Sequence, residues 1–205
     1  IGLVEQIFDW FREENTLIMV DPVMGDGGKL YKTYTPEMAS GMARLCGRAD
    51  IVVPNMTEAH HLLEREYDPG PYTRQQIEGI LKGLCALGPR MAVLTGVWLK
   101  EGSLGTACYD AATGEAELYL TDRIEGFYHG TGDLFASALL GGLLNGMSLN
   151  AACETATEFT WRTIETTHEK CADHRFGPKF ECHLPWLGEK MEACRKTIAN
   201  PVDLR

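Results

Sequence analysis

The sequence has no apolar run long enough to cross a membrane and few basic residues. Its longest apolar stretch, 134–144, carries glycines and follows a helical pattern. There are 19 Lys and Arg against 29 Asp and Glu, which gives a net charge of −10. A surface that binds nucleic acid or anionic lipid needs clustered Lys and Arg. We therefore expect neither nucleic acid nor a membrane among the partners of this protein.

Cysteine pairs of the C-x-x-C type are also lacking. The seven cysteines are an odd number and are scattered, which is typical of reduced thiols in a cytoplasmic protein rather than of a disulfide framework. One segment is rich in potential zinc ligands: His168, Cys171, His174, Cys182 and His183. Their spacing matches no standard zinc pattern, so we expect loop residues without a metal there.

The chain does not begin with Met but opens on an amphipathic helical pattern. Val4, Ile7, Phe8 and Phe11 recur at helical spacing. A helix ahead of the first strand of a parallel sheet normally follows an earlier strand, so we expect a further portion of the domain before Ile1. The length of 205 residues, with 44% apolar and 23% charged residues, suits one globular domain.

Short apolar runs alternate with helical patterns through the first half of the chain. Buried parallel strands are predicted at 16–20, 51–53 and 91–94, since residues on both faces are apolar. The glycine-containing stretch 24–32 is expected to be a loop. Helices are predicted after caps or turns at Thr35, Thr57, Thr73, Gly132, Ser148 and Pro185.

A hairpin is predicted from two strands at 106–109 and 115–120, which flank a turn at 111–114. Strands that alternate with helices, followed by a hairpin and further helices, predict an α/β fold. We expect a three-layer α/β/α domain with a mostly parallel sheet and a C-terminal antiparallel hairpin.

Polar and glycine residues follow each of the three predicted parallel strands. In an open α/β sheet, ligands bind beyond the carboxyl ends of the strands. The residues at these ends are Asp21, Asp26, Asn55, Glu58, Thr95 and Gly96. Carboxylates here suit Mg²⁺, which is often held by one or two carboxylates and phosphates. Taken singly, each residue also has a structural explanation, namely strand termination, an Asx-turn or helix capping.

The segment Gly130-Thr131-Gly132-Asp133 stands at a predicted helix start. Two glycines let the backbone approach a ligand, and the free amides and dipole of the helix favour an anion. Asp133 in the first turn is placed to accept a proton from an attacking hydroxyl. A plain glycine turn with Asp133 as a capping residue is the structural alternative.

Together these motifs resemble the ribokinase-like superfamily, and most closely its pyridoxal/pyridoxamine kinase branch. The resemblance covers essentially the whole chain. The motifs that carry it are Asp21-Pro22-Val23-Met24-Gly25-Asp26-x-Gly28-x-x-Tyr31, Pro54-Asn55-x-x-Glu58, Gly130-Thr131-Gly132-Asp133-Leu134-Phe135-Ala136 and Ile198-Ala199-Asn200-Pro201.

The resemblance implies a role for each motif residue. Asp133 is similar to the catalytic base, and Gly130, Thr131 and Gly132 are similar to the anion hole for the transferred phosphoryl group. The positions implied near Mg²⁺ and a monovalent cation such as K⁺ are Asp21, Asp26 and Glu58. Those implied to contact ATP are Asn55, Thr95 and Gly96, with Tyr31 in the loop that covers it.

The implied activity is ATP-dependent phosphorylation of the 5′-hydroxymethyl group of a vitamin B6 vitamer by a cytoplasmic homodimer. Two alternatives stay open. A hydroxymethylpyrimidine (phosphate) kinase shares the Asp21-Pro22-Val23-Met24 strand end and the glycine segment. A non-catalytic ligand-binding protein of the same fold is the other alternative, which the intact Asp133 disfavours.

Overall fold

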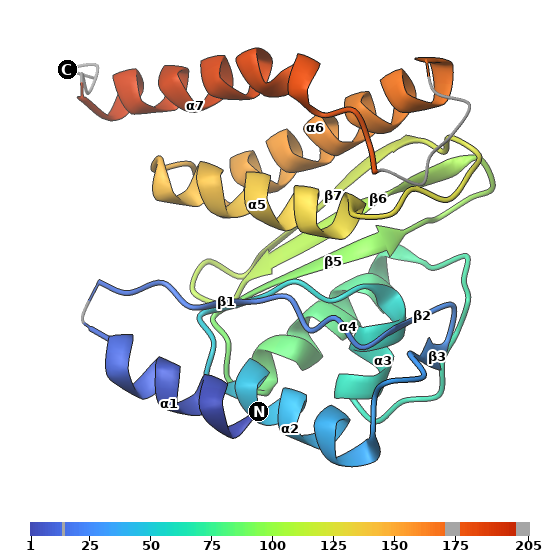
Figure 1. Ribbon diagram of the computed structural model, residues 1–205, viewed down its shortest axis with the longest axis vertical. Coiled ribbons are helices and arrows are strands. Elements are labelled where there is room, and N and C mark those ends of the chain that lie inside the picture. Colours follow the sequence, from blue (N-terminus) through green and yellow to red (C-terminus); the bar gives the residue numbers. More distant parts are fainter. Residues whose placement is uncertain (14, 171–176, 200–205) are drawn as a thin grey trace. The chain divides into compact units, whose positions relative to one another are not determined.

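The computed structural model describes residues 1–13, 15–170 and 177–199 (Figure 1). The chain forms two compact units, Ile1–Leu120 and Thr121–Arg205, and each is described by itself. Of the tail motif at 198–201, Asn200 and Pro201 lie outside the described residues.

A five-stranded sheet forms the centre of the first unit. Its order is β1 (Met19–Val20), β4 (Ile51–Val52), β5 (Met91–Val97), β6 (Ser103–Asp110) and β7 (Glu115–Asp122), whose last two residues belong to the second unit. The first three strands are parallel, whereas β6 runs antiparallel to β5. The α/β class is therefore confirmed, and the predicted hairpin is present as β6 and β7.

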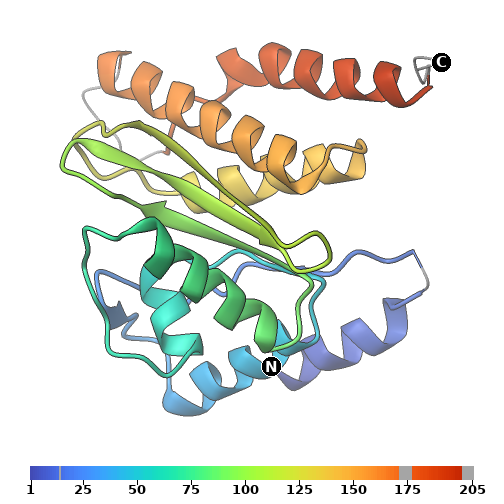
Figure 2. The ribbon, with the colours of Figure 1, turned by 180° about the vertical axis from the view of Figure 1, so that it is seen from behind.

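Four helices of the first unit lie on one side of this sheet in both ribbon views (Figures 1 and 2): α1 (Gly2–Phe11), α2 (Pro36–Gly47), α3 (Met56–Leu62) and α4 (Arg74–Ala86). The capping box predicted at Thr73 and Gln76 opens α4, and its apolar face is buried as the helical spacing predicted. The core joins Ile77, Leu81 and Leu84 of α4 to strand residues such as Leu94. These contacts fix α3 and α4 against the strands whose ends carry the predicted site.

Three local predictions for the first unit are wrong. The N-cap of α3 is Asn55 and not Thr57, because the side chain of Asn55 accepts the amide of Glu58. The first strand is confined to Met19–Val20. The stretch 24–32 is not an irregular loop but contains a two-stranded antiparallel ribbon of β2 (Gly25–Asp26) and β3 (Lys29–Leu30).

The second unit consists of α5 (Thr131–Leu144), α6 (Leu149–Lys170), a 3₁₀ turn (Glu181–His183) and α7 (Leu184–Ala199). Phe135 and Leu139 of α5 and Phe159 of α6 are buried. A Cβ atom at Gly142 would lie 3.1 Å from the Cβ atom of Ala152, so this glycine lets α5 and α6 pack closely. The packing of α5 against α6 thus fixes the helix that begins with the glycine segment.

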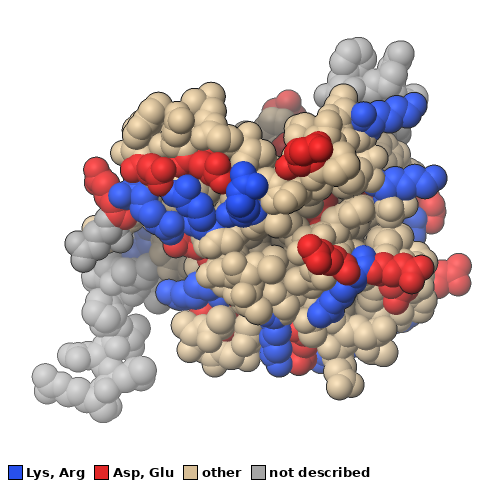
Figure 3. All heavy atoms as spheres, turned by 90° about the horizontal axis from the view of Figure 1, so that it is seen from below, with Lys and Arg blue, Asp and Glu red and all other residues tan. Residues whose placement is uncertain are grey.

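Charged side chains of both signs are interspersed on the face shown in Figure 3. Helix α1 is joined to α2 by the ion pairs Arg44–Glu5 and Arg48–Asp9, which as surface pairs contribute at most about 1 kcal/mol each. In the part of the chain that the structure describes, no helix combines the length and apolarity that crossing a membrane requires.

Candidate functional site

The first turn of α3 satisfies its own amide groups with side chains. The Oδ1 atom of Asn55 accepts the amide of Glu58 at 2.9 Å, and the Oε2 atom of Glu58 accepts the amide of Asn55 at 2.9 Å. This is a reciprocal capping box. The capping alternative considered from the sequence is therefore correct for both residues, and any role in catalysis is additional to it.

The same turn also holds the segment that follows β1. The Oε1 atom of Glu58 accepts the amide of Met24, and the Nδ2 atom of Asn55 donates to the carbonyl of Gly25, both at 2.9 Å. The hydroxyl of Thr57 accepts the amide of Gly28 at 2.9 Å. Two motifs that lie 30 residues apart in the sequence are thus brought together by side chains of one helical turn.

Glu58 is a buried carboxyl group, with 3% of its surface exposed. Burial raises its pKa from the ordinary value of 4.5 to about 7, the amides of Asn55 and Met24 lower it, and the charge of Asp21 raises it. Both oxygens accept backbone amides. This carboxyl group therefore combines a raised pKa with two hydrogen bonds, one of which holds the segment that follows β1.

Tyr31 and the two aspartates are grouped around this carboxyl. Burial raises the pKa of Tyr31, and so, in decreasing order, do the negative charges of Asp26, Glu58 and Asp21. Tyr31 is 46% exposed, so its ring is available to a ligand. Asp26 accepts the amide of the next residue, Gly27, at 2.8 Å, whereas an Asx-turn would use the amide two residues on.

Thr95 and Gly96 lie within β5 rather than beyond its end, because pairing with β6 extends this strand to Val97. Thr95 forms an isolated parallel bridge with Asn55, and its amide donates to the carbonyl of Pro54 at 3.0 Å. The register shifts between Thr95 and Val97, and Gly96 between them is exposed with φ +71°. Gly96 is therefore the residue at which the register of β5 and β6 shifts, as in a β-bulge, a feature that is common next to binding sites.

The second group of predicted residues begins α5. Gly130 is the N-cap and has a left-handed conformation, with φ 83°, and no side chain caps the helix. Gly132 and Asp133 in the first turn are exposed. No atom comes within 4 Å of a Cβ added at Gly130 or Gly132. Amide groups at an uncapped helix start, next to open space, are chemically suited to bind an anion.

The segment before α5 is anchored by Tyr128, a residue that the sequence analysis did not single out. Its hydroxyl donates to the carbonyl of Glu125 at 3.0 Å and lies 2.8 Å from the Nδ1 atom of His168. Because a carbonyl can only accept, the Nδ1–H of His168 donates to Tyr128. The hydroxyl of Thr131 donates to the carbonyl of Tyr128 at 3.1 Å, which ties the glycine segment to this anchor.

Among the described residues, no group of three or more His, Cys, Asp or Glu is placed to hold a metal ion. His168 contacts Tyr128 and His183 contacts Thr166, whereas Cys171 and His174 lie outside the described residues. Among the described residues, Asp21, Asp26 and Glu58 therefore do not form a complete metal site, and Mg²⁺ near them would need phosphates and water in its ligand set.

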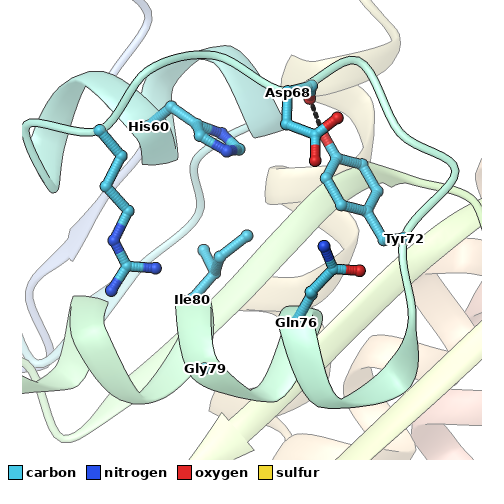
Figure 4. A pocket seen from close by; sticks show the side chains of 7 residues that line it. His60, Asp68, Tyr72, Gln76, Gly79 and Ile80 are labelled. Atoms are coloured by element: carbon cyan, nitrogen blue, oxygen red, sulfur yellow. Dashed lines mark hydrogen bonds between the residues drawn. The ribbon is translucent and has the colours of Figure 1, made fainter.

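A separate pocket of about 220 Å³ opens between α3 and α4 (Figure 4). Its lining includes His60, Arg65, Asp68, Tyr72 and Gln76. None of the predicted site residues lines it. The Nδ1 atom of His60 lies 2.6 Å from the carbonyl of Met56, so this buried imidazole is a packed and satisfied group.

The chain is similar to known proteins in both sequence and structure. A family model described as phosphomethylpyrimidine kinase matches residues 2–179. The chain belongs to this family, an α/β family of the ribokinase-like superfamily, and resembles pyridoxal kinases within it.

Three relatives illustrate the similarity. The pyridoxine/pyridoxal/pyridoxamine kinase of Bordetella avium is 29% identical over 158 residues, which are 74% of this chain and 50% of that protein. A Bacteroides thetaiotaomicron protein described as a phosphomethylpyrimidine kinase and crystallised with pyridoxal has 31% identity and a TM-score of 0.86, over 91% of this chain and 66% of that one. Lactobacillus plantarum pyridoxal kinase has 30% identity and a TM-score of 0.78, over 94% and 67%. The chain thus spans half of the first relative.

Proposed function

We propose that this chain provides the nucleotide-binding and phosphoryl-transfer part of an ATP-dependent kinase. Its acceptor is the 5′-hydroxymethyl group of pyridoxal, pyridoxamine or pyridoxine. Membership of the phosphomethylpyrimidine kinase family supports the reaction class. The names of the Bordetella avium and Lactobacillus plantarum relatives, and the pyridoxal in the Bacteroides thetaiotaomicron crystal, support the acceptor.

The uncapped start of α5 carries this proposal. Phosphoryl transfer depends on positioning and charge neutralisation. The amides that follow Gly130 have no side-chain cap, so they are available to the oxygens of the transferred phosphoryl group. Asp133 accepts the proton of the attacking hydroxyl while that oxygen bonds to the γ-phosphorus and ADP leaves.

The first unit supplies the proposed contacts to the nucleotide. Asn55, Thr95 and Gly96 face its phosphates, and Tyr31 covers it. Mg²⁺, and K⁺ as a monovalent cation, neutralise phosphate charge when bound near Asp21, Asp26 and Glu58. The negative charges of these three carboxylates all raise the pKa of Tyr31. This supports the proposal that the carboxylates and Tyr31 lie around one binding site.

The test is the formation of ADP by the complete protein, as its gene encodes it, with ATP, Mg²⁺ and one acceptor at a time. Pyridoxal, pyridoxamine and hydroxymethylpyrimidine are compared with a reaction without acceptor. We expect kcat/KM to be highest for a B6 vitamer. A preference for hydroxymethylpyrimidine would refute the proposed acceptor and support the hydroxymethylpyrimidine kinase alternative, which agrees with the description of the family. ATP binding without turnover of any acceptor would refute a kinase.

We also propose that the protein is a cytoplasmic homodimer. Free thiols at Cys46, Cys85, Cys182 and Cys194 support a reducing compartment. Light scattering at several protein concentrations tests the dimer, and a constant mass of one chain would refute it.

A further inference from the structure

The β2–β3 ribbon is too short to hold its own shape. Each strand has two residues, whereas an isolated hairpin is marginal even at greater length. Its conformation must therefore come from the elements it contacts. The ribbon carries Asp26, and Tyr31 directly follows it, so its position matters to the nucleotide in the function proposed above.

We propose that Thr57 is a positioning residue for the nucleotide, because its hydroxyl fixes the turn of the β2–β3 ribbon at Gly28. This inference rests on the proposed function for its effect on catalysis, but not for its effect on the ribbon.

The environment of Gly28 shows how the turn is held. Its amide donates to the Oγ1 atom of Thr57 at 2.9 Å. Its φ of +78° is in the left-handed region, and a Cβ atom there would lie 2.5 Å from the ring of Tyr67. The glycine backbone is thus enclosed by the hydroxyl of Thr57 and the ring of Tyr67.

The hydroxyl of Thr57 is not needed to cap α3. Asn55 and Glu58 already form the capping box, and Thr57 is only 2% exposed. A buried hydroxyl that accepts the amide of Gly28 instead of serving its own helix has a role in the ribbon. A change from Thr to Val at this position keeps the shape and the cap but removes the acceptor.

Steady-state kinetics with ATP as the varied substrate test the catalytic part. For Thr57→Val we expect a KM for ATP raised about 2- to 10-fold, as for the loss of one hydrogen bond, with kcat changed by less than about twofold. Thr57→Ser retains the oxygen and should restore the wild-type KM. The matched control is Thr163→Val, a buried threonine of α6 whose hydroxyl bonds the carbonyl of Phe159, and it should leave the KM for ATP unchanged.

Amide hydrogen exchange tests the ribbon without any activity. We expect faster exchange at Gly28 and neighbouring ribbon amides in Thr57→Val, but not in Thr57→Ser or Thr163→Val. Unchanged exchange would refute the proposal. Faster exchange with an unchanged KM for ATP would refute the link to nucleotide while leaving the kinase in place. If Thr57→Val does not fold, Thr57→Ala removes the same oxygen and is measured instead. An inactive wild type would refute the proposed function. The exchange measurement would still test whether the hydroxyl of Thr57 holds the ribbon at Gly28.

Discussion

Helices α3 and α5 both begin at predicted site motifs, but their first turns are built in opposite ways. Asn55 and Glu58 cap α3, and the carboxylate of Glu58 is buried there. Helix α5 begins at a left-handed glycine, has no side-chain cap and exposes Asp133. The first turn of α3 places a carboxyl group against its own amides, whereas the first amides of α5 have no side-chain cap.

We therefore expect the first turn of α3 to contribute mainly to stability and the first turn of α5 mainly to ligand binding. A capped turn with a buried carboxylate stabilises the fold and fixes its neighbours, here the β2–β3 ribbon. An uncapped turn loses the stability that a cap gives, about 1 kcal/mol, and gains the ability to bind a phosphate. Substitutions at α5 should therefore change activity more than stability, and substitutions at α3 should change both.

The largest expected effect is on kcat in Asp133→Asn. The amide cannot accept the proton of the acceptor hydroxyl, so kcat should fall by about 10²- to 10⁴-fold. The thermal midpoint should stay close to that of the wild type, because Asp133 is exposed. Asp122→Asn, an exposed aspartate of β7, is the control. Equal activities of both variants would contradict the role of Asp133.

Gly132→Ala in α5 should raise the stability of the protein while it lowers its activity. Alanine replaces glycine inside a helix, with no atom within 4 Å of the new Cβ, so stability should rise by about 0.5–1 kcal/mol. If the phosphoryl group binds at the free amides of α5, the added methyl group in the same turn should hinder it, and kcat/KM should fall by roughly tenfold or more. Denaturant unfolding and initial rates on the same preparation measure both. A more stable variant with full activity would exclude this anion site.

Glu58→Gln should change how stability depends on pH. The folded pKa of Glu58, about 7, lies above the ordinary value of 4.5, so the folded state binds more protons between these values. Stability from this group is therefore greatest at low pH and is lost as pH rises from about 4.5 through 7, by a few kcal/mol at most. Unfolding free energies at several pH values should show the difference between wild type and variant changing across this window. A constant difference would mean that Glu58 titrates normally.

Where Glu58 is ionised, above about pH 7, the Gln variant should also destabilise the ribbon. A carboxamide offers one oxygen where the carboxylate offers two, and both now accept backbone amides. Loss of one acceptor should cost about 1–3 kcal/mol. Glu154→Gln, an exposed residue of α6, should be neutral.

The smallest expected effect is in Tyr128→Phe. The change removes the hydroxyl that joins Glu125 and His168, at a cost of about 1 kcal/mol. Amide exchange at 125–131 should become faster while α5 keeps its protection. The same exchange pattern in both proteins would show that Tyr128 does not anchor the glycine segment.

Much of the first unit could be predicted because its signals are local. The capping box at Thr73 and Gln76 and the apolar spacing of Ile77, Leu81 and Leu84 specify α4 by themselves. The α/β class follows from the alternation of such signals. The β6–β7 hairpin was also recognisable, although β5 and β6 extend further than the apolar pattern suggests.

The predictions from sequence are wrong or incomplete where contacts between distant residues determine the local structure. Thr57 and Asn55 are both good N-cap residues, and the sequence could not show that the hydroxyl of Thr57 would bind Gly28 instead. The β2–β3 ribbon has two-residue strands, too short for any periodicity. Tyr128 was missed because its partner His168 is 40 residues away. The roles of Asp21, Asp26 and Asp133 in catalysis stay predictions.

The boundary between the two compact units falls inside β7, between Leu120 and Thr121. A protein engineer who divided the chain there would cut a strand rather than a linker. The turn before β7 is a better place, since residues 111–114 are exposed and Gly114 has φ +75°. For split-reporter fusions, circular permutation or tag insertion, this hairpin tip is the first site to choose, and the apparent unit boundary is the one to avoid.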